Sequence, residues 1–355
     1  MIFASISPLK YRWSAPHKFF FTFLLFFSLF APLPYVFFLP GTPDDVGGSL
    51  ITIKDAKTYP THGKLFITSI LVTNPDASVF GFETAFNWSR ASSVVLPRDV
   101  VYPPTQSAEE AEQESVDDMA TSQSAATAAA LRHLGYKVTP AFYISKVRDY
   151  SDARGKLLEQ DYVIAIDGKK IMSVDDIRNS YAQKKVGEKL RITVERFSES
   201  GTSSTSTFDV ALISSQEPSS SGLRVGQPAI GVLIGTTGRF PLDVRFNLNE
   251  VGGPSAGLIF AVGIVEKLTE EDLLRGRSVA GTGTISTMGQ VGAIGGIEEK
   301  MIGARRAGAT IFLAPRENCP DINHIPRGLT VIPVSTLDEA ISVLRSPENA
   351  KFPHC

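Results

Sequence analysis

The feature that most constrains this chain is an uncharged apolar run at residues 19–39, FFFTFLLFFSLFAPLPYVFFL. It has about the ~20 residues that a helix needs to cross the hydrocarbon core of a bilayer. Basic residues precede the run, and Asp44 and Asp45 follow it, so the positive-inside rule places the N-terminus in the cytosol and the rest of the chain outside. We therefore expect a single-pass transmembrane anchor over 19–39, contact with the lipid bilayer and a catalytic domain outside the cytoplasm.

Two prolines bear on this prediction. The part of the run before Pro32 has only the length of a signal-peptide core, and Pro34 follows closely. No small-x-small cleavage site follows the run, which favours an anchor that is kept. Whether the anchor is ever removed is left open by the sequence.

Length and charge narrow the function classes. With 355 residues the chain has material for several modules, and a net charge of -2 with a pI near 6.2 gives no basic surface for nucleic acid. Cys319 and Cys355 form no metal-binding spacing, and a bridge between them is left open.

Motifs for nucleotides and metals are absent from the 355 residues. No Gly-x-x-x-x-Gly-Lys-Ser/Thr occurs, so the sequence predicts no nucleotide site of that type. The five histidines are scattered, and no two stand in a His-x-x-x-His pair. We expect neither a cofactor nor a catalytic metal.

The segment after the apolar run indicates strands and then a helix. β-branched residues alternate at 50–54 and 64–73, which is typical of strands. Residues 107–134 are rich in Ala, Glu, Ser and Gln, carry acidic residues early and stop before Gly135, which predicts a helix.

Residues 137–215 alternate short strand patterns with one helical stretch. The order, and especially GKLLEQDYVIAIDG at 155–168 followed by a Val-Asp-Asp-Ile helix, resembles a bacterial PDZ domain. Asp152-Ala153 and Gln160-Asp161 depart from the Pro-Ala and Gly-Asp that are usual there. The resemblance implies that a peptide or C-terminus adds a strand to a sheet edge, and the alternative is a small α+β spacer that binds nothing.

One hydroxyl stands in Gly-Gly-Pro-Ser-Ala-Gly at 252–257, before an apolar helix. Ser255 is therefore either a helix cap or a nucleophile. The same residues satisfy Gly-x-Ser-x-Gly, the nucleophile elbow of α/β-hydrolases, with His324 as the base. The residues before Gly252 make a poor central strand, and His324 lies in a Pro-flanked loop, so this hydrolase alternative is weak.

A lysine follows in a second stretch, SVAGTGTISTMGQVGAIGGIEEKM at 278–301, which predicts two strands, a Gly-Gly turn and a helix. Lys300 falls in the first turn of that helix among apolar residues, and both the helix dipole and burial favour its neutral amine. A neutral lysine near a serine is a general base. The alternative is a solvated lysine that pairs with Glu298 or Glu299.

The two stretches together, with Ala307-Gly-Ala and Phe312-Leu-Ala-Pro after them, closely resemble the proteolytic domain of Lon-type serine peptidases. The resemblance implies that Ser255 is the nucleophile, Lys300 the general base and Thr282 the residue that orients the lysine. Backbone around Gly252, Gly253 and Ala256 would support the oxyanion, because Pro254 has no N–H to give. At Gly252, ATP-dependent Lon enzymes often carry an acidic residue.

The whole order resembles membrane-anchored, ATP-independent Lon-like PDZ proteases of bacteria. It implies a serine endopeptidase with a Ser-Lys dyad that acts on unfolded or peptide-like proteins at the membrane and forms a homo-oligomer; the alternative is a membrane-tethered PDZ adaptor with a non-catalytic Lon-type scaffold. The expected fold is α+β and multi-domain. Its segments are 1–18 (cytosolic), 19–39 (anchor), 41–134 (strand-rich segment plus helix), 135–215 (PDZ-like domain), 216–224 (linker) and 225–346 (Lon-type proteolytic α/β domain).

Overall fold

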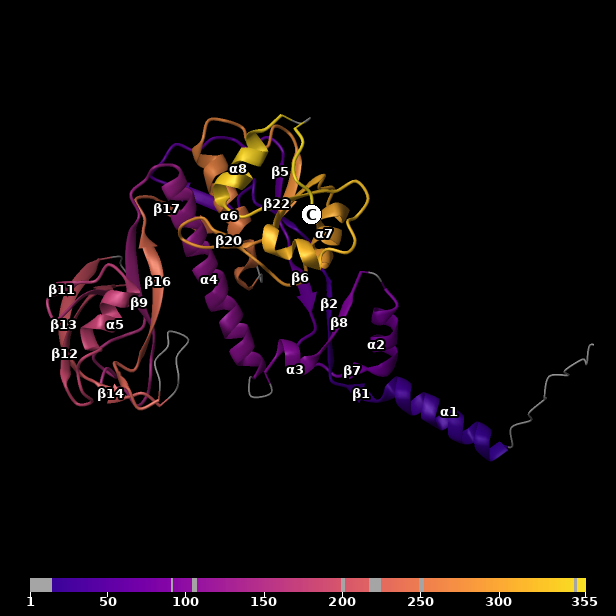
Figure 1. Cartoon of the computed structure of the whole chain (residues 1–355), viewed down its shortest axis with the longest axis horizontal. Helices are drawn as coiled ribbons and strands as arrows, with labels where there is room; N and C mark the ends of the chain where they lie inside the picture. Colours follow the sequence, from indigo (N-terminus) through magenta and orange to yellow (C-terminus); the bar gives the residue numbers. More distant parts are fainter. Residues whose placement is uncertain are drawn as a thin grey trace, which may run out of the picture.

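The structure is a computed structural model that describes residues 15–90, 92–103, 107–198, 202–216, 225–248, 252–347 and 350–355. Most of the predicted cytosolic segment 1–18 and of the linker 216–224 lies outside these residues. The described part forms an N-terminal body, a PDZ-like body and a C-terminal body, and the long helix α4 (Ala108–His133) runs between the last two (Figure 1).

The C-terminal body is built on a five-stranded sheet in the order β22-β21-β18-β5-β3, where β22, β21, β18 and β5 are parallel and β3 is antiparallel to β5. Two further pairs, β17-β4 and β19-β20, flank it. The strands are β3 (Asp44–Asp45), β4 (Ile51–Lys54), β5 (Lys64–Ile67), β17 (Asp243–Phe246), β18 (Ser278–Gly281), β19 (Thr284–Ile285), β20 (Val291–Gly292), β21 (Ile311–Pro315) and β22 (Thr330–Val334).

Helices cover both faces of this sheet because its strands are apolar on both faces. Leu65 and Leu313 point to the face covered by α4, α6 (Gly257–Leu268) and α8 (Leu337–Arg345). Their neighbours Phe66 and Phe312 point to the opposite face, covered by α7 (Ile297–Arg306). Successive side chains of a strand alternate between faces, so one apolar run supplies two cores. Burying a side chain such as Phe312 contributes roughly 1.5–3 kcal/mol.

Strands β3, β4 and β5 belong to this C-terminal body although the sequence suggests a separate segment over 41–134. β5 pairs in register with β18, with Leu65 opposite Val279. Helix α4, which also comes from the part of the chain before the PDZ-like body, packs on α6. The C-terminal body is therefore assembled from residues on both sides of the PDZ-like body, which is an insertion into it.

The PDZ-like body is an antiparallel sheet in the order β13-β12-β10-β9-β16, with β11 paired to β10. Strand β16 lies beyond the predicted boundary at residue 215, and it pairs with β9 along its whole length. The elements are β9 (Thr139–Val147), β10 (Tyr162–Ile166), β11 (Lys169–Lys170), α5 (Val174–Tyr181), β12 (Lys189–Phe197), β13 (Ser203–Ala211), β14 (Ile213–Ser214), β15 (Pro228–Ala229) and β16 (Val232–Arg239).

The two unusual dipeptides of this body have clear structural roles. Gln160 has a φ of 68°, the left-handed region that glycine adopts most readily. The fully buried Asp161 accepts hydrogen bonds from the Arg196 guanidinium and from the Leu158 N–H. Asp152 accepts from the Ala211 N–H and from Lys156. These carboxylates tie the turn before β10 to the distant strands β12 and β13.

In the N-terminal body, residues 19–39 do not form the single transmembrane helix that the sequence predicts. Helix α1 (Ala15–Phe30) ends before Pro32, which has no N–H to continue the helical ladder. The rest of the apolar run forms β1 (Pro32–Leu33) and β2 (Tyr35–Pro40), and β2 pairs with β6 (Ile70–Val72) and β8 (Val94–Pro97). The run 19–39 therefore contains most of helix α1 and, after it, strand β1 and most of β2. Among the described residues, no helix has the length and apolar character needed to cross a membrane.

The remaining elements complete this body. β7 (Val79–Phe80) pairs with β1, and α2 (Gly81–Trp88) packs against α1. Helix α3 (Arg98–Val101) follows β8 and leads toward α4. In Figure 1 α1 extends away from the rest of the molecule, on the opposite side from the PDZ-like body.

Candidate active site

Ser255 lies on a single 3₁₀ turn, η1 (Pro254–Ala256), that leads directly into α6. Gly253, at the start of the turn, has a φ of 83°, which explains a glycine there. Pro254 occupies the first helical position, where its missing N–H costs nothing. The serine is half-buried at the end of a helix whose inner residues are fully buried.

Lys300 meets this serine from α7. Its Nζ lies 2.8 Å from Ser255 Oγ, although the two residues are 45 positions apart in the sequence. Only 3% of the Lys300 surface is exposed, and its Nζ also lies against the fully buried Thr282 hydroxyl. The structure thus brings together the two residues that the sequence predicts as nucleophile and base.

Burial dominates the electrostatics of Lys300. It lowers the pKa of the amine to about 8, because the charged form loses hydration in the core. Among the described residues, no carboxylate lies within salt-bridge distance of Lys300. Glu298 instead accepts from the backbone N–H groups of Asn323 and His324, and Glu299 is buried with a raised carboxyl pKa. The alternative of a solvated Lys-Glu pair does not fit this geometry.

Thr282 is fully buried beside the same two residues. Its Oγ1 accepts from Lys300 Nζ at 3.3 Å and donates to the Ser255 carbonyl at 3.0 Å. The hydroxyl therefore connects the lysine to the backbone of the serine, where it can orient the amine.

The loop before Ser255 approaches α4 closely at Gly252. A Cβ on Gly252 would lie 1.9 Å from Ser115 Oγ, so a larger residue at this position would require the Ser115 hydroxyl to move. Ala256 is buried, and its side chain belongs to the core under α6.

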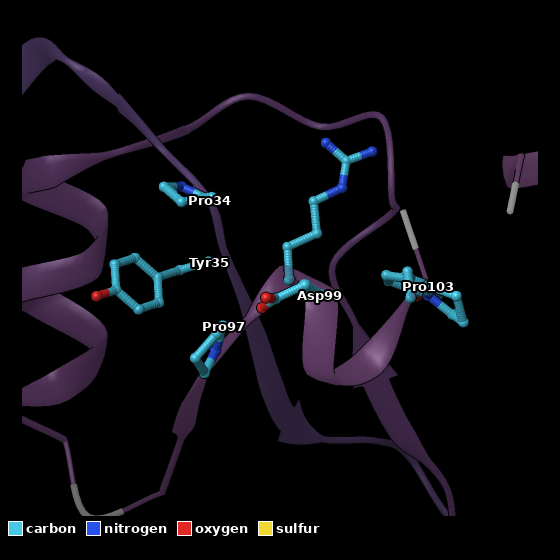
Figure 2. Close-up of a pocket in the computed structure, with 7 residues that line it drawn as sticks. Pro34, Tyr35, Pro97, Asp99 and Pro103 are labelled. Carbon is cyan, nitrogen blue, oxygen red and sulfur yellow. The ribbon is translucent and has the colours of Figure 1, made fainter. Parts of the chain in front are cut away.

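A cleft of about 1160 Å³ opens in front of the Ser255-Lys300 pair. Its walls are β6 with the residues before it, the N-terminal half of α4, and the loop that carries Gly252 and Gly253. The dyad lies in this cleft and not in the smaller pocket of about 530 Å³ shown in Figure 2. That second pocket is bounded by Pro34, Tyr35, Pro97, Asp99 and Pro103, together with Arg98 and Tyr102.

His324 does not join the site. It is exposed in the loop after η2 (Arg316–Asp321) and is not among the residues that line the cleft. The arrangement of an α/β-hydrolase triad with this histidine as base is therefore not present.

The sequence predicts the helix over 107–134 but not that it forms a wall of the cleft. Ala111, Ser115, Met119 and Ser122 recur every three or four residues and share the helix face that meets the cleft and η1. That periodicity was the available signal, although small and polar residues on the face make it faint.

Comparisons with known proteins match the part of the C-terminal body that carries Ser255 and Lys300. Residues 250–345 match the family described as the Lon protease (S16) C-terminal proteolytic domain. The chain carries a Lon-type proteolytic domain. The resemblance inferred from the sequence is confirmed, and the Lon-type domain is a serine-type peptidase domain.

Curated relatives are similar over the Lon-type domain alone. Lon protease 1 of Bacillus subtilis (strain 168) is 45% identical over 93 residues, which cover 25% of this chain and 12% of that protein. Lon protease 2 of Herpetosiphon aurantiacus is 37% identical over 110 residues, which cover 29% of this chain and 13% of that protein. The chain thus spans only about an eighth of the length of these relatives.

Residues 122–212 match the PDZ domain family, so the second resemblance is also confirmed. A solved PDZ domain, from the SdrC-like protein of Listeria monocytogenes, is 22% identical, covers 26% of this chain and 85% of that one, and has a TM-score of 0.21. PDZ domains bind peptides by adding a strand to an exposed sheet edge. The matched residues begin inside α4, so one helix belongs to both the PDZ match and the wall of the Lon-type cleft.

Proposed function

We propose that this chain is a serine endopeptidase that hydrolyses unfolded or peptide-like polypeptides with a Ser255-Lys300 dyad. The observation that carries the proposal is the 2.8 Å contact between Lys300 Nζ and Ser255 Oγ at the floor of an open cleft. A buried amine with a pKa of about 8 is about one tenth neutral at pH 7, and a neutral amine accepts a proton.

Acylation follows from this geometry. Neutral Lys300 takes the proton of Ser255 Oγ while the oxygen forms a bond to the peptide carbonyl carbon. Backbone N–H groups at the start of α6 stabilise the oxyanion, with the helix dipole in support. The C–N bond then breaks, and Lys300 returns the proton to the leaving amine, which leaves an ester between Ser255 and the substrate.

Deacylation repeats these steps with water. Lys300, neutral again, takes a proton from a water molecule that attacks the ester carbonyl. Collapse of the second oxyanion breaks the ester, and the proton returns to Ser255 Oγ. Throughout, the Thr282 hydroxyl keeps the amine near the serine, because it contacts both Lys300 Nζ and the Ser255 carbonyl.

The substrate class follows from the cleft and from the motifs. An open cleft between β6 and α4 accommodates an extended chain, whereas a folded protein does not present its peptide bonds to the floor. The 355 residues contain no Walker-type motif to drive unfolding. We therefore expect the purified chain to cleave a denatured protein or a fluorogenic peptide without nucleotide, at a rate that ATP changes by less than about twofold. A strict requirement for ATP would contradict this part of the proposal.

We also propose a membrane location with the catalytic body outside the cytoplasm. Two observations support it. Helix α1 exposes large apolar side chains, among them Phe19, Phe23 and Phe27 at 76%, 55% and 62%, which is costly in water. Cys319 and Cys355 form a disulfide, and such bonds persist mainly in oxidising compartments.

Fractionation tests this location. The chain should sediment with membranes, and its cysteines should resist maleimide until a reductant is added. Replacing Phe23 and Phe27 with glutamate should release it, since charged residues do not enter the apolar layer. A chain that is soluble with both thiols free would contradict the proposal.

A further inference from the structure

The loop in front of the nucleophile is held by α4, a helix from a distant part of the chain. The Gly253 N–H donates to the Ser115 carbonyl at 2.9 Å. The Ser122 hydroxyl donates to the Pro254 carbonyl, also at 2.9 Å, across a separation of 132 residues. Ser122 is 4% exposed, so water does not compete for this bond.

The bond from Ser122 fixes a group with a direct chemical use. The carbonyl of Pro254 and the N–H of Ser255 belong to one planar peptide unit, and in a trans peptide the two point in opposite directions. Holding the carbonyl toward α4 therefore holds the Ser255 N–H away from α4. The carbonyl of Ser255 is fixed separately, because it accepts from the Gly283 N–H at 2.8 Å and from Thr282 Oγ1.

We propose that Ser122 is a positioning residue for peptide hydrolysis: its hydroxyl orients the Pro254–Ser255 peptide so that backbone donors face the oxyanion. The inference rests on the proposed Ser255-Lys300 chemistry. Oxyanion stabilisation depends on donors that are fixed before the charge develops, and a peptide free to rotate loses part of that effect.

The surroundings of Ser122 allow its hydroxyl to be removed cleanly. A Cβ on Gly257 would come within 2.9 Å of Ser122 Oγ, so α6 and α4 approach closely here because Gly257 has none. Alanine at position 122 is smaller than serine and fits the same space. The main change in Ser122→Ala is then the loss of the hydrogen bond by which the α4 side chain holds the Pro254 carbonyl of η1.

The chain supplies a matched control two residues further along α4. Ser124 Oγ shares a 2.6 Å hydrogen bond with Thr237 Oγ1 of β16, in the PDZ-like body. Ser124→Ala removes a hydroxyl and a hydrogen bond from the same helix without touching the nucleophile loop. A purely structural effect on α4 should therefore be similar in the two variants.

The test compares steady-state cleavage of a fluorogenic peptide by the full chain and its variants. In Ser122→Ala, kcat should fall about tenfold to a hundredfold, with KM within about twofold. Affinity for a peptide boronate, which imitates the tetrahedral state, should weaken by about the same factor. The pH at which kcat/KM reaches half its maximum, which the pKa of Lys300 sets, should not move, because Lys300 keeps its contacts. Ser122→Cys keeps a weaker donor at this position, so its kcat should lie between those of the wild-type chain and of Ser122→Ala.

Two results would overturn the inference: wild-type kcat in a folded Ser122→Ala, or an equal loss of kcat in Ser124→Ala. Ser255→Ala separates this inference from the proposed function. If Ser255→Ala is inactive while Ser122→Ala is fully active, only the role of Ser122 fails. If Ser255→Ala retains wild-type activity, the dyad itself fails.

Discussion

Replacing either member of the dyad is expected to lower kcat/KM for peptide cleavage by at least about a thousandfold. Ser255→Ala removes the atom that forms the acyl-enzyme, and Lys300→Met removes the proton acceptor 2.8 Å from it. The two losses should not add in the double variant, because each residue is useless without the other. Steady-state assays of the purified variants measure all three values.

Stability provides the control for this prediction. Methionine fills much of the buried volume of Lys300 and needs no partner for a charge, so Lys300→Met should fold. Ser255 lies on a half-buried turn, and its alanine variant loses only a hydroxyl. Labelling by a serine-reactive probe should occur in the wild-type chain and disappear in Lys300→Met. Cleavage at the wild-type rate by either folded variant would exclude the dyad and favour a non-catalytic scaffold beside a PDZ domain.

The dyad could be predicted from the sequence because its partners sit in distinctive local patterns. The serine stands in Gly-Gly-Pro-Ser-Ala-Gly, and the lysine follows a Gly-Gly turn. These two patterns are unusual enough to be recognised together. Local spacing alone could not pair them, since they stand 45 positions apart, with helix α6 and strands β18, β19 and β20 between them. Likewise, the fully buried state of Thr282 depends on the packing of α7 against the sheet, which no short window contains.

The contribution of α4 could not be predicted for a different reason. Ser115 and Ser122 act through hydrogen bonds to backbone groups, so the identity of their partners leaves no mark on the sequence around them. Their helix is followed by the whole PDZ-like body before the chain returns to Gly252. Only the three-dimensional insertion of one body into the other makes them neighbours of the nucleophile.

The predicted anchor shows how composition can hide a boundary. Residues 19–39 are uniformly apolar, and a hydropathy window cannot distinguish the exposed phenylalanines of α1 from the buried Val36 and Phe37 of β2. The two halves of the run can be told apart only from their tertiary contacts. β2 is the central strand between β6 and β8, and its apolar residues serve a core rather than a lipid phase.

The pH dependence of cleavage is expected to follow the ionisation of Lys300. Burial lowers the pKa of this amine to about 8, and only the neutral form accepts the proton of Ser255. Below pH 8 the neutral fraction falls about tenfold per pH unit, to about 1% at pH 6. The value of kcat/KM should therefore rise about tenfold per unit up to a midpoint near pH 8 and then become constant. A peptide assay from pH 5.5 to 9.5 measures this curve.

A second lysine tests whether the midpoint belongs to Lys300. Burial also lowers the pKa of Lys267, near the end of α6, where its Nζ donates to the carbonyls of Gly47 and Gly48. Lys267→Met should leave the midpoint of the activity curve in place, because Lys267 is not among the residues that line the cleft. A midpoint that moves in Lys267→Met, or activity that stays constant from pH 6 to 9, would show that neutral Lys300 does not control the reaction. Because burial is what lowers the pKa of Lys300, the midpoint of the curve also reports whether the amine stays shielded from water during catalysis.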